Sequence, residues 1–168
     1  RIAPAKNIHI FIEALGILKN KIPNFIVNIY GDATKNHESY LNKLKSRVNE
    51  LDLKDLVFFH KGIENHNTPE IYSKHQIFVN LSSSGMYDKT IFEAMACRSI
   101  VLASNENLRE NIDDRMIIKN REKDEVSEKI YTALSLSEID ENTIVTNNAK
   151  FAEQHSLKAL SEKLAILM

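Results

Sequence analysis

Glycine is scarce in this sequence, whose 168 residues include only Gly16, Gly31, Gly62 and Gly85. Their spacing cannot form the Gly-x-Gly-x-x-Gly fingerprint that holds a dinucleotide pyrophosphate at the start of a helix. Long apolar runs are also missing, and a helix that spans a bilayer needs about twenty consecutive apolar residues. The sequence therefore predicts neither a dinucleotide-binding protein of that type nor a membrane-spanning one.

Cysteine and paired metal ligands are scarce as well. The single thiol, Cys97, cannot form an intrachain disulfide, which fits a reducing compartment. The six histidines show no metal-ligand spacing, so no metal site is expected. The 22 basic residues are balanced by 23 acidic ones, and no basic stripe carries interleaved aromatic residues. This balance argues against a nucleic-acid-binding protein.

What the sequence does contain is a regular alternation of strand-like and helix-like segments. The expected strands are 25–30, 56–60, 77–81, 99–103 and 116–118. The expected helices are 8–18 with Asn7 as cap, 37–51, a short one that Thr68 caps, one after the loop at 82–89, and helices from about Asp124 onward, the last capped by Ser156. This alternation predicts an α/β fold, a Rossmann-like doubly wound parallel sheet with helices on both faces.

The most informative segment lies between the strand at 77–81 and the next helix. Residues 82–85 read Ser-Ser-Ser-Gly, and Gly85 permits backbone angles that other residues avoid. The first amides of the following helix, around Asp88 to Thr90, are expected to be free, and a helix N-terminus favours a phosphate. An ordinary serine-glycine turn explains the same residues equally well.

One charged residue, Glu93, interrupts an otherwise apolar helix. It lies in the run Ile-Phe-Glu-Ala-Met-Ala at 91–96, and a carboxylate among apolar neighbours needs a hydrogen-bonding partner. A ribose offers two hydroxyl donors, and hydrogen bonds to a charged acceptor contribute a few kcal/mol. The segment therefore predicts a nucleotide site, with a solvated Glu93 as the alternative.

This segment resembles the signature of family 4 glycosyltransferases, the large retaining group with the GT-B fold. In that family the glutamate of the Glu-Ala-Met-Ala run contacts the ribose of the nucleotide sugar, and here it is Glu93. A second glutamate normally stands eight positions earlier and contacts the donor sugar, but Gly85 occupies that place. Some branches carry Gly-x-x-Asp-Lys instead, which matches 85–89, so the resemblance suggests Asp88 as a substitute.

Other segments extend the resemblance. Arg1 and Lys6 match an Arg-x-x-x-x-Lys stretch whose cations grip the donor diphosphate, and the charge of such a leaving group must be stabilised. Gly31 is similar to part of the family's Gly-Asp-Gly turn, and Gly62 and Ile63 stand where the family has a Phe-x-Gly segment that helps to enclose the base. Solvated cations and ordinary glycine turns are the alternatives at these positions.

The resemblance thus implies a set of site residues. Arg1 and Lys6 would be catalytic, because they would hold the diphosphate and stabilise its departure. The donor-binding residues would be Gly31, Gly62, Ile63, Gly85, Met86, Tyr87, Asp88, Lys89, Thr90 and Glu93. The resemblance implies no cofactor and no metal, since the nucleotide-diphosphate sugar is itself the substrate.

The resemblance also implies that residues 1–168 form a single donor-binding domain, the C-terminal half of a GT-B enzyme. We expect the first strand of this domain and an N-terminal acceptor domain to precede Arg1, and the isolated domain to be inactive. The implied reaction is retaining transfer of a hexose to a saccharide or lipid-linked acceptor, as in polysaccharide biosynthesis. The implied location is cytoplasmic, with peripheral association at the inner face of the membrane.

Two other functions remain as alternatives. A degenerate, non-catalytic nucleotide-sugar-binding module would explain why Gly85 stands where the family has a glutamate. A sugar epimerase with the GT-B fold is the second, although the Ala-Met-Ala continuation of the signature favours the transferase.

Overall fold

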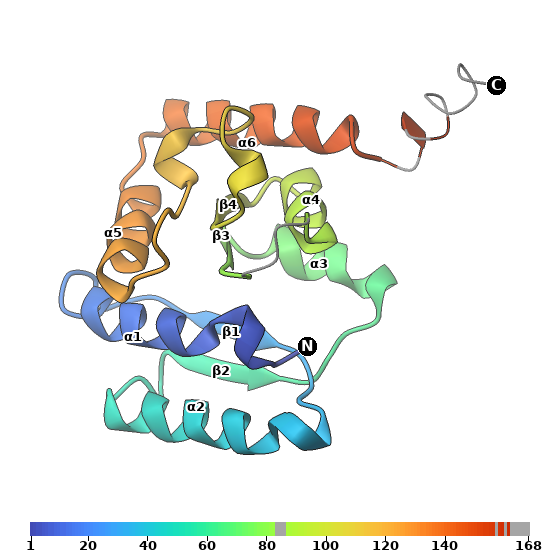
Figure 1. Ribbon diagram of the computed structural model, residues 1–168. Helices are drawn as coiled ribbons and strands as arrows, with labels where there is room; N and C mark the ends of the chain where they lie inside the picture. Colours follow the sequence, from blue (N-terminus) through green and yellow to red (C-terminus); the bar gives the residue numbers. More distant parts are fainter. Residues whose placement is uncertain (83–86, 157, 160, 162–168) are drawn as a thin grey trace.

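The chain alternates short strands with helices in a computed structural model that describes residues 1–82, 87–156, 158, 159 and 161 (Figure 1). The strands are β1 (Val27–Tyr30), β2 (Val57–His60), β3 (Ile77–Asn80) and β4 (Ile100–Ala103). The α-helices are α1 (Ile8–Leu18), α2 (Glu38–Glu50), α3 (Thr68–Ser73), α4 (Lys89–Ala96), α5 (Lys123–Leu134) and α6 (Glu138–Glu153). Over this part of the chain four of the five expected strands are confirmed, and they alternate with helices as expected.

The strands pair in parallel. β1 runs beside β2 with Val27 opposite Val57, and β3 runs beside β4 with Ile77 opposite Ile100. Parallel neighbours need a crossover connection, which α2 supplies for the first pair and α4 for the second. The predicted parallel α/β architecture is confirmed, although among the described residues the strands form two pairs rather than one continuous sheet.

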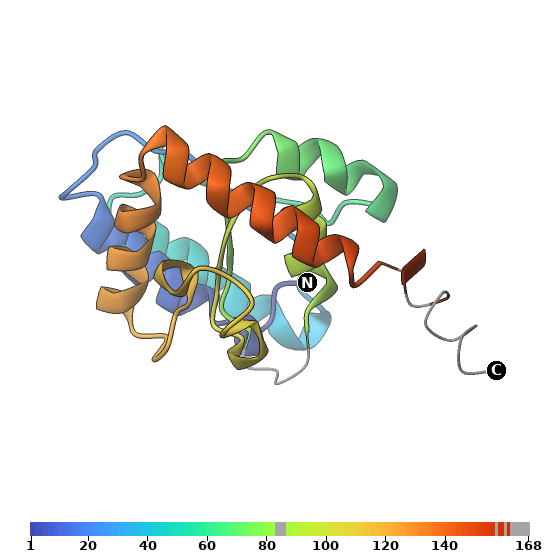
Figure 2. The ribbon, with the colours of Figure 1, turned by 90° about the horizontal axis from the view of Figure 1, so that it is seen from above.

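Helices cover the strand pairs and bury their apolar residues. Figure 1 shows β1 and β2 between α1 and α2, and Figure 2 shows α6 crossing over β3 and β4. One buried cluster joins α1, α2 and α5 to the strands, and a second joins α4, β4 and the end of α6. Of the helices in the described ranges, none is long and apolar enough to cross a bilayer.

One expected helix cap makes no capping bond, and a second is displaced by one residue. Asn7 occupies the N-cap position of α1 as expected, but among the described residues its side chain makes no capping hydrogen bond. Its backbone is left-handed, with φ of 51°, and its Nδ2 donates to the carbonyl oxygen of Leu81 at 2.8 Å. Thr68 is the first residue of α3 rather than its cap, and its hydroxyl donates to the carbonyl oxygen of Asn65 at 2.8 Å. Both side chains bond to carbonyl oxygens instead of helix amides.

The C-terminal third departs from expectation at one strand. A 3₁₀ turn at Asp114–Met116 takes up part of the segment 116–118, which leaves one parallel bridge between Ile117 and Ala103. Ser156 accepts a hydrogen bond from the amide of Ala159 at 3.2 Å, as expected of a cap. The apolar residues expected in that last helix at 157, 160 and 164 lie outside the described residues.

Candidate functional site

A cavity of about 1120 Å³ extends from the apolar face of α1 to the carboxyl ends of β1 and β3 and the start of α4. Ligands of open α/β sheets bind at this end of the strands. The predicted site residues that line this cavity are Arg1, Lys6, Gly31, Gly62, Ile63, Asp88, Lys89, Thr90 and Glu93. Segments far apart in the sequence are thus gathered around one space, and the roles of these residues stay predictions.

Three predicted site residues are not part of this group. Gly85 and Met86 lie outside the described residues. Tyr87 is absent from the described lining of the cavity. Its ring packs edge-on against Phe92 with centroids 5.0 Å apart, and its hydroxyl donates to the carbonyl oxygen of Asn107 at 2.8 Å. The structure therefore places Tyr87 among aromatic contacts rather than beside Lys6 and the other lining residues.

Gly31 and Gly62 shape the edge of the cavity after β1 and β2. Gly31 has φ of 148°, and a Cβ there would lie 3.1 Å from the backbone nitrogen of Arg1, so glycine suits this position. The amide of Gly62 donates to Asp32 Oδ2 at 3.1 Å. The amide of Ile2 donates to the carbonyl oxygen of Asp32 at 3.0 Å. Asp32 therefore links the N-terminal segment, the β1 turn and the β2 turn.

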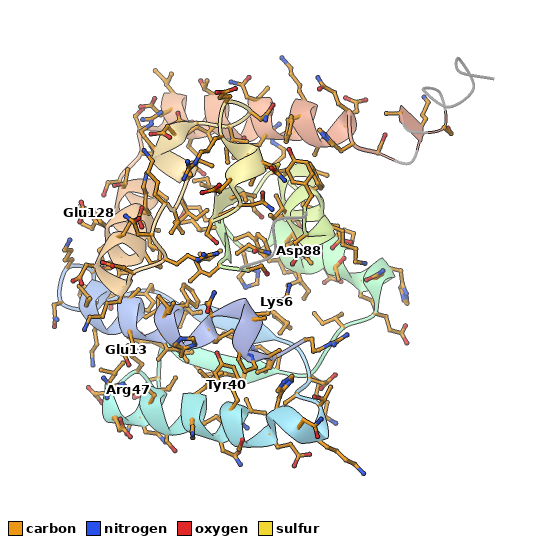
Figure 3. All side chains as sticks on the ribbon, viewed as in Figure 1. Lys6, Glu13, Tyr40, Arg47, Asp88 and Glu128 are labelled. Atoms are coloured by element: carbon orange, nitrogen blue, oxygen red, sulfur yellow. The ribbon has the colours of Figure 1, made fainter. Side chains whose placement is uncertain are left out.

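Lys6 and Asp88 face each other from the starts of α1 and α4 (Figure 3). Lys6 Nζ lies 2.5 Å from Asp88 Oδ2 and 2.9 Å from Ser82 Oγ. Asn80 Nδ2 also donates to Asp88 Oδ2, at 3.2 Å. Burial by itself would raise the pKa of Asp88, but hydrogen bonds from Lys6 and Thr90 lower it to about 2. The Asp88 carboxyl group is therefore ionised at neutral pH.

The other carboxylate oxygen of Asp88 caps α4. Oδ1 accepts from the Thr90 amide at 3.3 Å and from the Thr90 hydroxyl at 2.9 Å. The expectation that the Thr90 amide is free for a phosphate is therefore wrong, because the Asp88 side chain occupies it. A cap of this kind contributes about 1 kcal/mol to the stability of a helix.

Glu93 lies on the cavity wall and is held by two side chains. The Tyr72 hydroxyl donates to its Oε2 at 3.2 Å, and Lys89 Nζ lies 3.5 Å from its Oε1. Burial and the negative charge of Glu93 raise the pKa of Tyr72 well above its usual value, so Tyr72 keeps its proton and remains a donor. The carboxylate has its partners within the chain, while 30% of its side chain stays exposed.

The family model for glycosyl transferases group 1 matches residues 1–151. This chain belongs to that family. Among curated proteins none matches it significantly. The match covers every described residue that lines the cavity.

Solved structures share the fold of this group 1 glycosyl transferase chain. HepE of Anabaena, solved with UDP and glucose and also with UDP-glucose, is 20% identical with a TM-score of 0.79, over 98% of this chain and 46% of HepE. The C-terminal domain of the group 1 family protein LpcC from Francisella tularensis is 22% identical with a TM-score of 0.79, over 92% and 81% of the two chains. The catalytic domain of cholesterol-alpha-glucosyltransferase from Helicobacter pylori is 19% identical with a TM-score of 0.77, over 93% and 94%.

The fold is therefore the Rossmann-like C-terminal domain of a GT-B glycosyltransferase. The chain spans about half the length of HepE.

Two side chains on the cavity lining are missing from the sequence-based set. Asn80, at the end of β3, is 8% exposed, and its Oδ1 accepts from the Ser82 amide at 3.0 Å. A polar residue at the end of an otherwise apolar strand is the sequence signal that could have identified Asn80. Tyr72 lies on α3, 21 residues before Glu93, and no local pattern connects the two.

The charges of the glycosyl transferase cavity suit an anionic, hydroxylated ligand. Three cations, Arg1, Lys6 and Lys89, lie on its described lining with two carboxylates, Asp88 and Glu93, of which Asp88 caps α4. Glu93 can accept hydrogen bonds from hydroxyl groups. In the described ranges, no group of three or more histidine, cysteine or carboxylate residues is arranged to hold a metal ion.

Proposed function

We propose that this chain is the donor-binding domain of a retaining hexosyltransferase that uses a nucleotide-diphosphate sugar. The observation that carries the proposal is the position of Lys6 Nζ. It lies at the junction of β3 and α4, on the same cavity as Glu93. A cation and a hydroxyl acceptor on one cavity match two adjacent parts of a nucleoside diphosphate, its diphosphate and its ribose.

In the proposed complex, Lys6 and Arg1 hold the diphosphate. Breaking the bond between sugar and phosphate leaves negative charge on the nucleoside diphosphate, and fixed cations stabilise that charge as it develops. Glu93 accepts hydrogen bonds from the ribose while Tyr72 and Lys89 hold it in place. Glycine at positions 31 and 62 lets Arg1 and Asp32 approach the turns at the cavity edge, because a Cβ at Gly31 would crowd Arg1 and a Cβ at Gly62 would crowd Asp32.

The rest of the reaction is proposed from the family. The acceptor is a saccharide or lipid-linked sugar, supplied through another domain, as in polysaccharide biosynthesis, and transfer needs no metal or other cofactor. UDP-sugars are the first donors to test, since HepE is solved with UDP-glucose. A cytoplasmic protein, peripheral to the inner face of the membrane, completes the proposal.

Calorimetric titration of the full-length protein with UDP-, GDP- and ADP-glucose tests the donor site. We expect one of them to bind, and Lys6→Ala and Glu93→Ala each to weaken that binding at least about tenfold, the loss of one charge-assisted contact. Substitution of Lys21 or Glu128 supplies the control. These two residues form an ion pair at 2.6 Å, and in the described ranges neither of them lines the cavity. Figure 3 shows Glu128 on α5, away from Lys6 and Asp88.

Turnover of the donor by the full-length protein distinguishes the alternative functions. Transfer or slow hydrolysis of the bound donor supports the transferase. Binding without any turnover would identify a non-catalytic module instead. Interconversion of the sugar without an acceptor would identify an epimerase. If the wild type binds no donor while it is folded, or if Lys6→Ala and Glu93→Ala leave binding unchanged, the proposed donor site is wrong.

A further inference from the structure

Asp88 is the most heavily bonded acidic side chain on the cavity, and its partners come from three segments. Its Oδ2 receives Lys6 Nζ at 2.5 Å, Asn80 Nδ2 at 3.2 Å and Ser82 Oγ at 3.5 Å. Its Oδ1 receives the amide and the hydroxyl of Thr90. An ionised carboxylate has about four lone-pair sites, so these bonds already use its acceptor capacity.

The side chain is also enclosed, since 18% of Asp88 is exposed against 40% of Lys6. A sugar hydroxyl could reach Asp88 only by displacing the lysine or by breaking the cap of α4. Lys6, in contrast, keeps exposed surface toward the cavity while one side of its ammonium group is fixed. The more accessible member of the pair is therefore the cation.

We propose that Asp88 is a positioning residue that fixes the Lys6 ammonium group for the donor diphosphate. This role rests on the proposed function, and it replaces the contact with the donor sugar that the family resemblance implies for Asp88. Asp88 is itself held by Asn80, a buried side chain at the end of β3, and by the first turn of α4. The position of the Lys6 ammonium group therefore depends on the residues where β3 meets α4.

The backbone around Lys6 supports this role. Lys6 ends a short 3₁₀ turn that begins at Pro4, and the next residue, Asn7, donates through Nδ2 to the carbonyl oxygen of Leu81. Two consecutive residues therefore bind the same β3–α4 junction. A free lysine side chain loses much rotamer entropy when it is fixed, and a lysine already held by Asp88 avoids that cost when the ligand arrives.

A double-mutant cycle in the full-length protein tests the role, with UDP and UDP-glucose as probes in calorimetric titrations and GDP and ADP added if UDP does not bind. Asp88→Asn keeps a good cap residue but removes the charge that holds Lys6. We expect it to weaken binding of UDP and of UDP-glucose equally, by roughly tenfold, the cost of ordering a free lysine. In a Lys6→Ala background, Asp88→Asn should change the affinity less than about twofold, because the residue it acts through is gone.

The control is Asp113→Asn, since Asp113 also caps a helical turn and pairs with an arginine, Arg115, at 2.8 Å. It should leave both affinities unchanged. If Asp88→Asn does not fold, Asp88→Ser retains a capping hydroxyl and takes its place in the cycle.

Each outcome decides the question. Weaker binding of UDP-glucose alone would mean that Asp88 contacts the sugar, and an equal effect with and without Lys6 would mean that the two act independently. Tighter binding of UDP would mean that Asp88 competes with the ligand for the lysine. Each of these overturns the positioning role and leaves the donor site intact. A wild-type protein that binds none of the probes would overturn the proposed function itself, and this role with it.

Discussion

Acidification should remove a defined part of the stability of this chain through Asp88. Its pKa falls from 3.8 to about 2 in the folded protein, against the opposing effect of burial, because Lys6 and Thr90 donate to the carboxylate. A group whose folded pKa is depressed stabilises the fold above its unfolded pKa. That stabilisation is fully present above about pH 4 to 5, and it is lost as the pH falls toward 2.

The magnitude follows from linkage. A fall in pKa from 3.8 to about 2 corresponds to about 2.4 kcal/mol of unfolding free energy. Because 18% of the side chain is exposed, solvent screening reduces this to about 1–2 kcal/mol. Asp88→Asn should therefore lower the unfolding free energy by about that amount at pH 6 and by only a small part of it at pH 2, where about half of the folded carboxyl groups are protonated.

Urea unfolding of the wild type and of Asp88→Asn, followed by circular dichroism between pH 2 and pH 6, measures the difference. Other carboxylates with lowered pKa values, such as Asp113 and Asp140, titrate in both proteins and cancel. In a Lys6→Ala background, the difference in unfolding free energy that Asp88→Asn causes should depend less on pH. A gap between the two proteins that stays constant from pH 2 to pH 6 would refute the reasoning.

Further changes test the cavity wall and its edge. Tyr72→Phe removes the hydroxyl that bonds Glu93 and should weaken donor binding by about 1 kcal/mol, measured by calorimetry; a change as large as that of Glu93→Ala would contradict a supporting role. Glu93→Gln should weaken donor use by about 1–3 kcal/mol in a kcat/KM comparison, and an unchanged kcat/KM would remove Glu93 from the site. Gly31→Ala should cost about 1–3 kcal/mol of unfolding free energy, because of its φ of 148° and the approach of Arg1; an unchanged urea midpoint would contradict this.

Much of the fold could be predicted because apolar periodicity is a local signal. The strand ending at Tyr30 and the helix at Ile8–Leu18 follow from residues within a few positions of one another. The capping bond expected of the Asn7 side chain is missing for a different reason. Asn7 bonds to Leu81, which is 74 residues away, and no local rule for caps anticipates a contact of that kind.

The site could be predicted only in part, because a motif names residues without giving their partners. The glutamate run identified Glu93, but its donor Tyr72 comes from another helix. Lys6 and Asp88 were both identified as site residues, yet 82 positions separate them, and only the fold shows that they form an ion pair. The capping of α4 by Asp88, which occupies the Thr90 amide, is a local contact, and an aspartate directly before a helix is a sequence signal that could have identified it.

The first seven residues join the two strand pairs. The Ile2 amide binds the carbonyl oxygen of Asp32 after β1, while Asn7 and Lys6 bind the end of β3 and the start of α4. Any widening of the cavity between β1 and β3 must therefore stretch this segment or release one of its ends. These polar contacts act together with the buried cluster that joins α1, α2 and α5 to the strands, so the position of one cavity wall is tied to that of the other.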